Sequence, residues 1–372
     1  MTQLPTATMK FKPLNLDKIT ERIEADEIGK HDLKVDGRDL EFTKRGTISI
    51  LDGYSRSEFK LNDWAFGQLC TKIGVPSNYL RKCPITGKGS QKDQIDLWKE
   101  TIADKKILLR VKYVAGVVDK PSGTPLQGFV RAVLMQSYGA LDNKPLWRLL
   151  RPFIQKNGLI VQSASLTDQS LHVRALYPDI LTIPTPTDKL GVHFVGLHTA
   201  NSEIGARYLT GDFVVWRQIC TNGMIAHFKN QSLFKQKHSK VDLTQLRLHI
   251  ASGLEGVHHH RGEMVEALIG SRTVLVKDPL KSLSSLLKRE KQPIEVMEMA
   301  ASQYEREPIA SKFGLAQAIT AAARLLKDAD KRMELEAIAG KYLLGSAGRG
   351  EGEEVPAEAV VDSIARRITT NV

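Results

Sequence analysis

The stretch RYLTGDFVVWRQICTNGMIAHFK, residues 207–229, decides how the rest of the chain is interpreted. Residues 213–220 are rich in β-branched and aromatic side chains, which is typical of a largely buried strand. The sequence TNG at residues 221–223 follows, and Asn-Gly is a strong signal for a tight turn. Basic residues lie before, within and after this strand. We therefore predict a buried strand that presents positive charge at a fixed place. The alternative is a core strand beside an ordinary solvated loop.

The composition of the whole chain favours a polyanionic partner. The 372 residues are 42% hydrophobic and 26% charged, as in a globular protein of one large or two ordinary domains. The net charge of +11 is unusual and favours nucleic acid or an anionic membrane surface. No apolar run is long enough to span a bilayer, and the first residues lack the apolar core of a signal peptide.

The cysteines point to a reducing compartment. Cys70, Cys83 and Cys220 are odd in number and have no CxxC spacing, which favours free thiols over a disulfide framework. We predict that Cys220, within the buried strand, packs in the core. We therefore expect a cytoplasmic, nucleoid-associated protein without a membrane partner, and DNA or RNA as its polyanion.

The periodicity of the apolar residues predicts an α+β fold, a β-meander with packed helices followed by a helical C-terminal region. In the first part, strand patterns alternate with a few helical stripes; the clearest strands are residues 47–52, 106–118, 128–136, 159–166, 171–177 and 191–198. One helical stripe is bounded by Asn62 as its N-cap and by Gly74, and TDQS at residues 167–170 is a hairpin signal between two of the strands. From residue 243 onward the pattern is helical. The predicted organisation is an irregular N-terminal arm at 1–46 with one short helix at 18–28, an α+β core at 47–242, a helical region at 243–344, a flexible linker at 345–356 and an amphipathic helix at 357–372.

Motifs of catalysis are missing from the sequence. His258, His259 and His260 are consecutive, so on a helix they point about 100° apart and cannot all reach one metal. The GKGS at residues 87–90 lacks the spacing of a P-loop, and no GxSxG, HExxH or GxGxxG occurs. Pro178-Asp179 has no Asp/Glu-x-Lys downstream to complete a nuclease motif. We predict a protein that is not an enzyme and needs no cofactor or metal.

Nucleic-acid binding remains as the positive signal. Lysine and arginine neutralise phosphates, and aromatic rings stack on unpaired bases. The alternative for each aromatic is a core position, and for each strand arginine an ion pair with a carboxylate. We predict a continuous basic track in which ten residues contact the nucleic acid: Arg131, Arg174, Arg207, Arg217, Lys229, Lys235, Lys237 and Lys240 at phosphates, with Tyr138 and Trp216 stacking on bases.

Several stretches together resemble a known family. DWAFGQLCTKIGVPSNYLRKCP at 63–84, VRAVLMQSYGALDNKPLWRLL at 130–150, WRQICTNGM at 216–224 and FGLAQAITAAARLLKD at 313–328, followed by MELEAIAGKYL, are similar to a phage/plasmid-like protein family. The similarity covers most of residues 47–344. The most specific parts are Arg217 with CTNG and the pattern from Arg131 to Tyr138. Met135 departs from the second pattern, where the family usually has a serine.

This resemblance implies a context rather than a mechanism. The family is a domain of unknown function of phages, prophages and conjugative plasmids, and it has no settled catalytic residues to transfer. The outline of the fold is also similar to single-strand annealing proteins of phages and of the eukaryotic Rad family, which form rings and hold DNA in a positive groove without nucleotide or metal.

From the residues and the resemblance together, we predict single-stranded DNA binding and annealing in phage or plasmid recombination and replication. The expected partners are single-stranded DNA, further copies of the chain in a ring or filament, and other replication or recombination proteins reached through the C-terminal tail. Two alternatives stay open. One is a nuclease or DNA-modifying enzyme with an unrecognised site, and the other is a protein-interaction factor that blocks a host defence.

Overall fold

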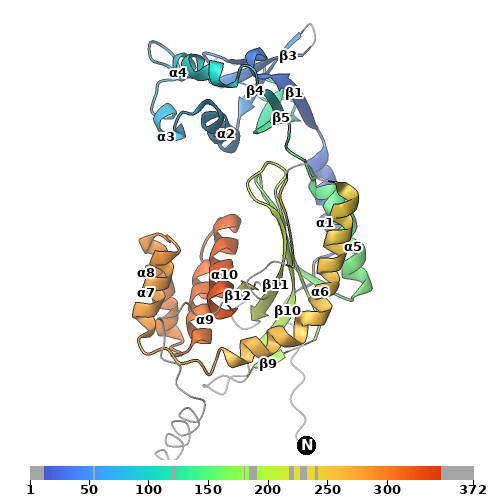
Figure 1. Cartoon of the computed structure of the whole chain (residues 1–372), viewed down its shortest axis with the longest axis vertical. Coiled ribbons are helices and arrows are strands. Elements are labelled where there is room, and N and C mark those ends of the chain that lie inside the picture. Colours follow the sequence, from blue (N-terminus) through green and yellow to red (C-terminus); the bar gives the residue numbers. More distant parts are fainter. Residues whose placement is uncertain are drawn as a thin grey trace, which may run out of the picture.

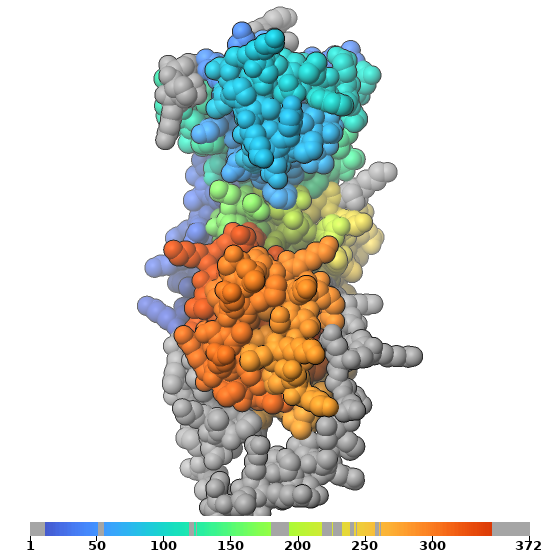
Figure 2. Space-filling view, turned by 90° about the vertical axis from the view of Figure 1, so that its left-hand side faces the viewer, coloured from blue at the N-terminus to red at the C-terminus, as the bar shows by residue number. Residues whose placement is uncertain are grey.

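The protein consists of two bodies stacked along its long axis (Figure 1). The computed structural model describes residues 12–52, 55–118, 123, 125–179, 181–183, 191–217, 222–226, 233–238 and 242–344. In the space-filling view, the blue and cyan N-terminal body, the green to yellow central segments and the orange to red C-terminal helices follow one another down this axis (Figure 2). Mixed sheets with a helical C-terminal region confirm the predicted α+β class.

A six-stranded sheet forms the N-terminal body. Its strands follow the order β1-β5-β6-β4-β3-β2, antiparallel throughout except for the parallel pair β4–β6. The strands are β1 (Lys30–Asp36), β2 (Leu40–Phe42), β3 (Thr47–Asp52), β4 (Ser55–Leu61), β5 (Lys106–Tyr113) and β6 (Gly128–Met135). The helical segments beside them are η1 (Gly37–Asp39), α2 (Asp63–Ile73), α3 (Ser77–Leu80), α4 (Gln91–Trp98) and η2 (Lys99–Ile102).

Helix α2 shows how local sequence signals set the ends of an element. The Asn62 side chain accepts a hydrogen bond from the Ala65 N–H at 2.8 Å, which caps the first turn. Gly74 ends the helix with φ +80°, a left-handed conformation that glycine adopts without strain. Between these caps, Phe66 and Leu69 face the core of the N-terminal body, so the helix predicted over this stretch forms there.

A seven-stranded antiparallel sheet forms the centre of the second body. Its order is β12-β11-β10-β8-β7, with β13 paired to β11 and β9 paired to β10. The strands are β7 (Ile160–Leu166), β8 (Leu171–Leu176), β9 (Leu181–Ile183), β10 (Gly191–Asn201), β11 (Leu209–Arg217), β12 (Asn222–Ala226) and β13 (Phe234–Gln236).

Helices cover this second sheet on both faces (Figure 1). On one side lie α1 (Leu16–Glu27), α5 (Asn143–Lys156) and α6 (Leu243–Gly270). On the other side lie α9 (Lys312–Ala323) and α10 (Ala329–Leu344), with α7 (Pro279–Arg289) and α8 (Ile294–Arg306) packed next to them. No helix among the described residues is both long enough and apolar enough to cross a membrane.

The strand register sorts apolar and polar residues onto opposite faces of the second sheet. Ala175, Leu197 and Phe213 are paired across β8, β10 and β11, and all three belong to the hydrophobic core. One residue along, Arg174, His198 and Asp212 form a parallel row that is buried yet polar. Buried polar groups need partners, and Arg174 of this row has one in Glu336 of helix α10.

The structure differs from the prediction most clearly near the N-terminus. The short helix predicted at residues 18–28 is present as helix α1, but residues expected to be irregular form the strands β1 and β2. Strand β1 has the sequence KHDLKVD and lies at the sheet edge, where Leu33 and Val35 are only partly buried. A short polar edge strand of this kind lacks the apolar run that sequence reasoning looks for. The predicted linker and tail, residues 345–372, lie outside the described residues.

Candidate nucleic-acid interface

The predicted strand arginines all occur in ion pairs. Arg131 Nη2 lies 2.6 Å from Glu203, and Arg207 Nη2 lies 2.8 Å from Asp330. Arg217 donates to both carboxylate oxygens of Glu307, at 2.8 and 2.7 Å. Arg174 is paired with Glu336, and both side chains are buried. As a correction to the predicted track, the structure places Arg174 and Arg217 inside the molecule rather than on a surface that phosphates reach.

The physical reason is the cost of burying charge. An isolated guanidinium loses several kcal/mol of hydration when it leaves water, so a buried arginine is stable only beside a carboxylate with good geometry. Each acidic partner comes from a distant segment, a loop or a C-terminal helix that closes over the sheet. These arginines therefore join elements of the fold.

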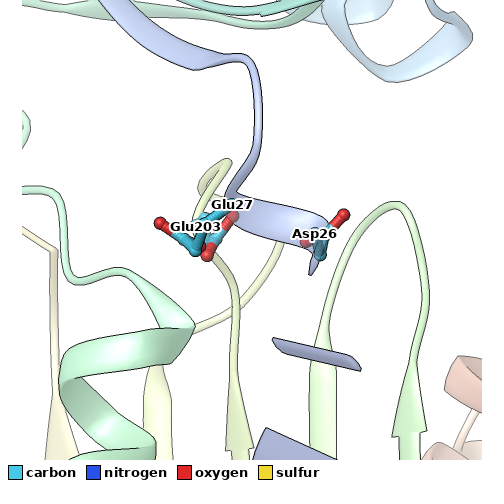
Figure 3. Close-up of side chains that lie close together, drawn as sticks. All are labelled: Asp26, Glu27 and Glu203. Atoms are coloured by element: carbon cyan, nitrogen blue, oxygen red, sulfur yellow. The ribbon is translucent and has the colours of Figure 1, made fainter. Parts of the chain in front are cut away.

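Glu203 forms the joint between the two bodies. It lies in the tight connection between β10 and β11 and faces Asp26 and Glu27 at the end of α1 (Figure 3). Among the described residues, these three form the group of acidic or other metal-ligating side chains that lie close enough together to hold a cation. The ammonium of Lys30 lies among them, 2.5 Å from Asp26, 3.0 Å from Glu27 and 2.7 Å from Glu203. Lys112 also pairs with Asp26, and Arg131 pairs with Glu203, so three cationic side chains of the protein balance the three carboxylates.

The neighbours of Glu203 hold it ionised. Burial alone would raise the pKa of this carboxyl group, but Lys30, Arg131 and the Asn143 N–H at 2.9 Å outweigh burial and lower its pKa to about 2. The adjoining carbonyl of Ile204 accepts hydrogen bonds from Trp64 Nε1 at 3.1 Å and from Gln68 Nε2 at 2.8 Å, both on α2. The β10–β11 connection is therefore fastened to the N-terminal body by charge and by hydrogen bonds.

A second polar cluster surrounds Asp330 at the start of α10. Ser170 Oγ donates to Asp330 at 2.6 Å, and His172 Nε2 lies 2.9 Å from the same carboxylate oxygen. The bond with His172, helped by Ser170 and Arg207 and opposed by burial, lowers the pKa of Asp330 to about 2. Burial lowers the pKa of His172, so its ring is neutral near neutral pH.

Serine, histidine and aspartate lie together here, yet their geometry is not that of a hydrolase triad. In a triad, the serine bonds to one imidazole nitrogen and the aspartate to the other. Here Ser170 and Asp330 share Nε2 of His172, at 3.0 and 2.9 Å, while Nδ1 lies 3.2 Å from His198. Ser170 is also fully buried. This cluster therefore stabilises the contact between sheet and helix, and no nucleophile is activated in it.

An open cleft of about 680 Å³ lies in the second body and is here called the Tyr208 cleft. Strands β11–β13 and the loop before β11 form one wall, and Met333, Glu334 and Ala337 of α10 contribute to the other. Tyr208 is 41% exposed, although its ring is large and apolar. The ammonium of Lys235 lies 5.0 Å from the ring centroid and that of Lys237 lies 5.9 Å away. An exposed ring close to two lysine ammonium groups is thus the central feature of the cleft.

The two predicted stacking residues have different surroundings from those expected. Trp216 is 1% exposed and packs against Phe194, with ring centroids 5.7 Å apart, so it is a core residue that offers no face to a base. Tyr138 lines the Tyr208 cleft, but its ring stacks on His238 at 5.4 Å and its hydroxyl donates to the Ser202 carbonyl at 3.2 Å. Burial raises the pKa of Tyr138. Tyr138 therefore supports the cleft floor.

Of the ten predicted contact residues, the cleft brings together four: Tyr138, Arg207, Lys235 and Lys237. Lys229 and Lys240, like Cys220, lie outside the described residues. Sequence reasoning missed Tyr208, although it stands next to Arg207 in the stretch 207–229. It also missed the wall from α10, for which the sequence carries no signal.

No protein-family model, curated protein or solved structure matches this chain. The fold and the cleft thus define an α+β protein with an aromatic, lysine-flanked cleft. The resemblance to the phage/plasmid-like family stays a prediction.

Proposed function

We propose that the protein binds single-stranded DNA in the Tyr208 cleft. The observation that carries this proposal is the exposed ring of Tyr208 with the ammonium groups of Lys235 and Lys237 at 5.0 and 5.9 Å. Aromatic rings give sequence-tolerant stacking to unpaired bases, and neighbouring lysines neutralise the phosphates of the same nucleotides. A cleft of about 680 Å³ lies within the usual size range of ligand sites.

The charges in the cleft predict weak binding at each site. Arg207 is neutralised by Asp330, and the cleft also contains the carboxylates of Asp212 and Glu334. Phosphate neutralisation therefore rests on Lys235 and Lys237. For two contacts on a single strand, the logarithm of the binding constant falls with the logarithm of salt with a slope of about −1.4.

Weak individual sites favour an assembly in which many copies line up along one strand. This is the requirement for annealing, because several phosphate contacts must act together to hold a long polynucleotide. The proposal therefore includes a homo-oligomer, a ring or filament, acting in recombination or replication of a phage or plasmid in the bacterial cytoplasm. Other recombination proteins are proposed partners through residues 357–372.

A salt titration tests the DNA-binding part directly. A fluorescent oligothymidine and the matching duplex are titrated with the full chain, with and without magnesium. We expect preference for the single strand, a negative salt slope and no cleavage. Binding without a salt slope, or equal affinity for the duplex, contradicts the proposal. Magnesium-dependent cleavage instead supports an enzyme, and lack of affinity for either DNA supports a protein-interaction factor.

Variants locate the binding in the cleft. Lys235→Gln with Lys237→Gln should abolish most of the salt slope, while the control Lys34→Gln with Lys105→Gln, two exposed lysines of the N-terminal body, should leave it unchanged. Tyr208→Ala should cost about 1–3 kcal/mol of binding, and Tyr208→Phe should retain it because the ring remains. If the two lysine pairs behave alike, the site lies elsewhere.

A further inference from the structure

A second, smaller cavity of about 130 Å³ adjoins the Tyr208 cleft and is here called the Arg332 cavity. Strands β7, β8 and β10 form one wall, and the end of α9 with the first turns of α10 forms the other. Met333 and His198 line both spaces, so they form the partition between the cavity and the cleft. The cavity is several times the ~30 Å³ that one water molecule occupies in the liquid. It is large enough for a small polyatomic ion.

The side chains around the Arg332 cavity have a positive balance. Three guanidinium groups line it, from Arg174, Arg324 and Arg332, against the single carboxylate of Glu336. Glu336 is already paired with Arg174 inside the protein. Burial keeps the lining imidazole of His172 neutral by lowering its pKa. An anion entering this space therefore meets an excess of cationic groups.

Hydrogen-bond donors accompany this charge. A guanidinium carries five N–H groups, and Arg332 uses one of them on the Leu326 carbonyl at 2.9 Å, which fixes its position. Its Nε, like that of Arg174, has no hydrogen-bond acceptor among the described residues. Ser163 and Ser165 lie two residues apart on β7, and both line the cavity with hydroxyl side chains. Arginine and serine together are the donor set that recognises phosphate oxygens.

The start of helix α10 lies in the same wall, where Ala329 is the first residue of this 16-residue helix. Its first N–H groups are capped within the chain, because Asp328 accepts hydrogen bonds from the Asp330 N–H at 2.9 Å and the Lys331 N–H at 3.0 Å. The side chains that line the cavity therefore supply the contacts to an anion. We propose that the Arg332 cavity binds a tetrahedral oxyanion of the phosphate class, with Arg332 as its main charged contact and Ser163 and Ser165 as hydroxyl donors.

Two sources supply this chemistry, free inorganic phosphate and the terminal phosphate of a strand in the adjoining cleft. Binding of free inorganic phosphate does not depend on DNA binding. The phosphate site in the Arg332 cavity and DNA binding in the Tyr208 cleft can therefore be refuted independently. The first experiment uses the full chain and inorganic phosphate alone, with chloride at matched ionic strength as the control. Binding is followed by calorimetry and by the rise in the thermal unfolding midpoint.

Variants assign the binding to the cavity. Arg332→Gln should lower the phosphate affinity by about tenfold or more, because a charge-assisted hydrogen bond is lost. Lys331→Gln removes the same charge from the neighbouring, exposed position and should leave the affinity unchanged. Ser163→Ala with Ser165→Ala should weaken binding by roughly a few-fold, and circular dichroism of each variant checks that it is folded.

The results decide the matter in either direction. Phosphate binding by the wild type that is lost in Arg332→Gln and kept in Lys331→Gln supports the site. No phosphate binding by the wild type, or unchanged affinity in a folded Arg332→Gln protein, overturns it. A 5′-phosphorylated oligothymidine that binds more tightly than its 5′-hydroxyl counterpart, with the difference lost in Arg332→Gln, identifies the strand end as the source. Equal binding of the two oligonucleotides identifies free phosphate.

Discussion

Replacing Glu203 by glutamine tests whether the joint between the two bodies is held by charge. Glu203 is 2% exposed, and its carboxylate is 2.7 Å from Lys30 and 2.6 Å from Arg131. Glutamine keeps the size and shape of the side chain. The substitution therefore removes the negative charge and leaves two buried cations with less compensation.

The expected cost follows from the pKa of the carboxyl group. Its surroundings lower the pKa from 4.5 to about 2. Each pKa unit corresponds to about 1.4 kcal/mol, so the site favours the charged form over a neutral one by about 3 kcal/mol. Removing one partner of a buried ion pair typically costs about 3–5 kcal/mol, which agrees with this value. We expect Glu203→Gln to lower the free energy of unfolding by about 3 kcal/mol.

Urea unfolding followed by tryptophan fluorescence measures this loss, since Trp64 donates a hydrogen bond across the joint to Ile204. The matched control is Glu41→Gln. Glu41 pairs with Arg56 at the surface, is 43% exposed, and should contribute less than about 1 kcal/mol. If the two variants lose the same stability, the joint is not held by the charge of Glu203 and the reasoning is refuted.

Three further substitutions or conditions test the packing and the buried charges. Trp216→Ala should destabilise the fold by about 3–5 kcal/mol, measured by thermal unfolding, because the indole is buried; a near-neutral effect would show that Trp216 is not a core residue. Gly196→Ala should prevent stable folding, because the added Cβ would lie 2.0 Å from the Ala175 carbonyl oxygen. The control is Gly262→Ala in helix α6, where the added Cβ meets no atom within 4 Å, and this variant should be neutral or stabilising in the same assay. Glu203 and Asp330 both have pKa values lowered to about 2, so the unfolded chain binds more protons and stability should fall as the pH drops from about 4.5 toward 2. Burial raises the pKa of Glu336, which opposes this trend, and a urea midpoint that increases on acidification would contradict the assignment of the two carboxylates.

Signals that act over a few residues predicted much of the fold. The caps Asn62 and Gly74 bound helix α2 as expected, and the β-branched run before Arg217 forms strand β11. The two strands β7 and β8 form the antiparallel pair that their turn sequence indicated. In each case, the determining residues are neighbours in the chain, so a single sequence contains the needed information.

The partners of the arginines could not be predicted in this way. Arg131 pairs with a carboxylate 72 residues away, Arg217 with one 90 residues away and Arg174 with one 162 residues away. Which acid meets which arginine depends on how helices close over the sheet. For the same reason, the cleft wall supplied by α10 could not be predicted. Trp216 was predicted both within a buried strand and as a base-stacking residue, because an aromatic residue beside an arginine has the same local sequence in a core and in a binding groove.

Helix α1 makes the second body discontinuous along the chain. Its Thr20 hydroxyl accepts hydrogen bonds from Trp147 Nε1 at 2.8 Å and from Arg151 at 2.9 Å, both on α5. All six strands of the N-terminal body lie between α1 and α5 in the sequence. A version trimmed of its first thirty residues would therefore lose a structural wall, and the second body could be made alone only by grafting α1 onto the start of α5.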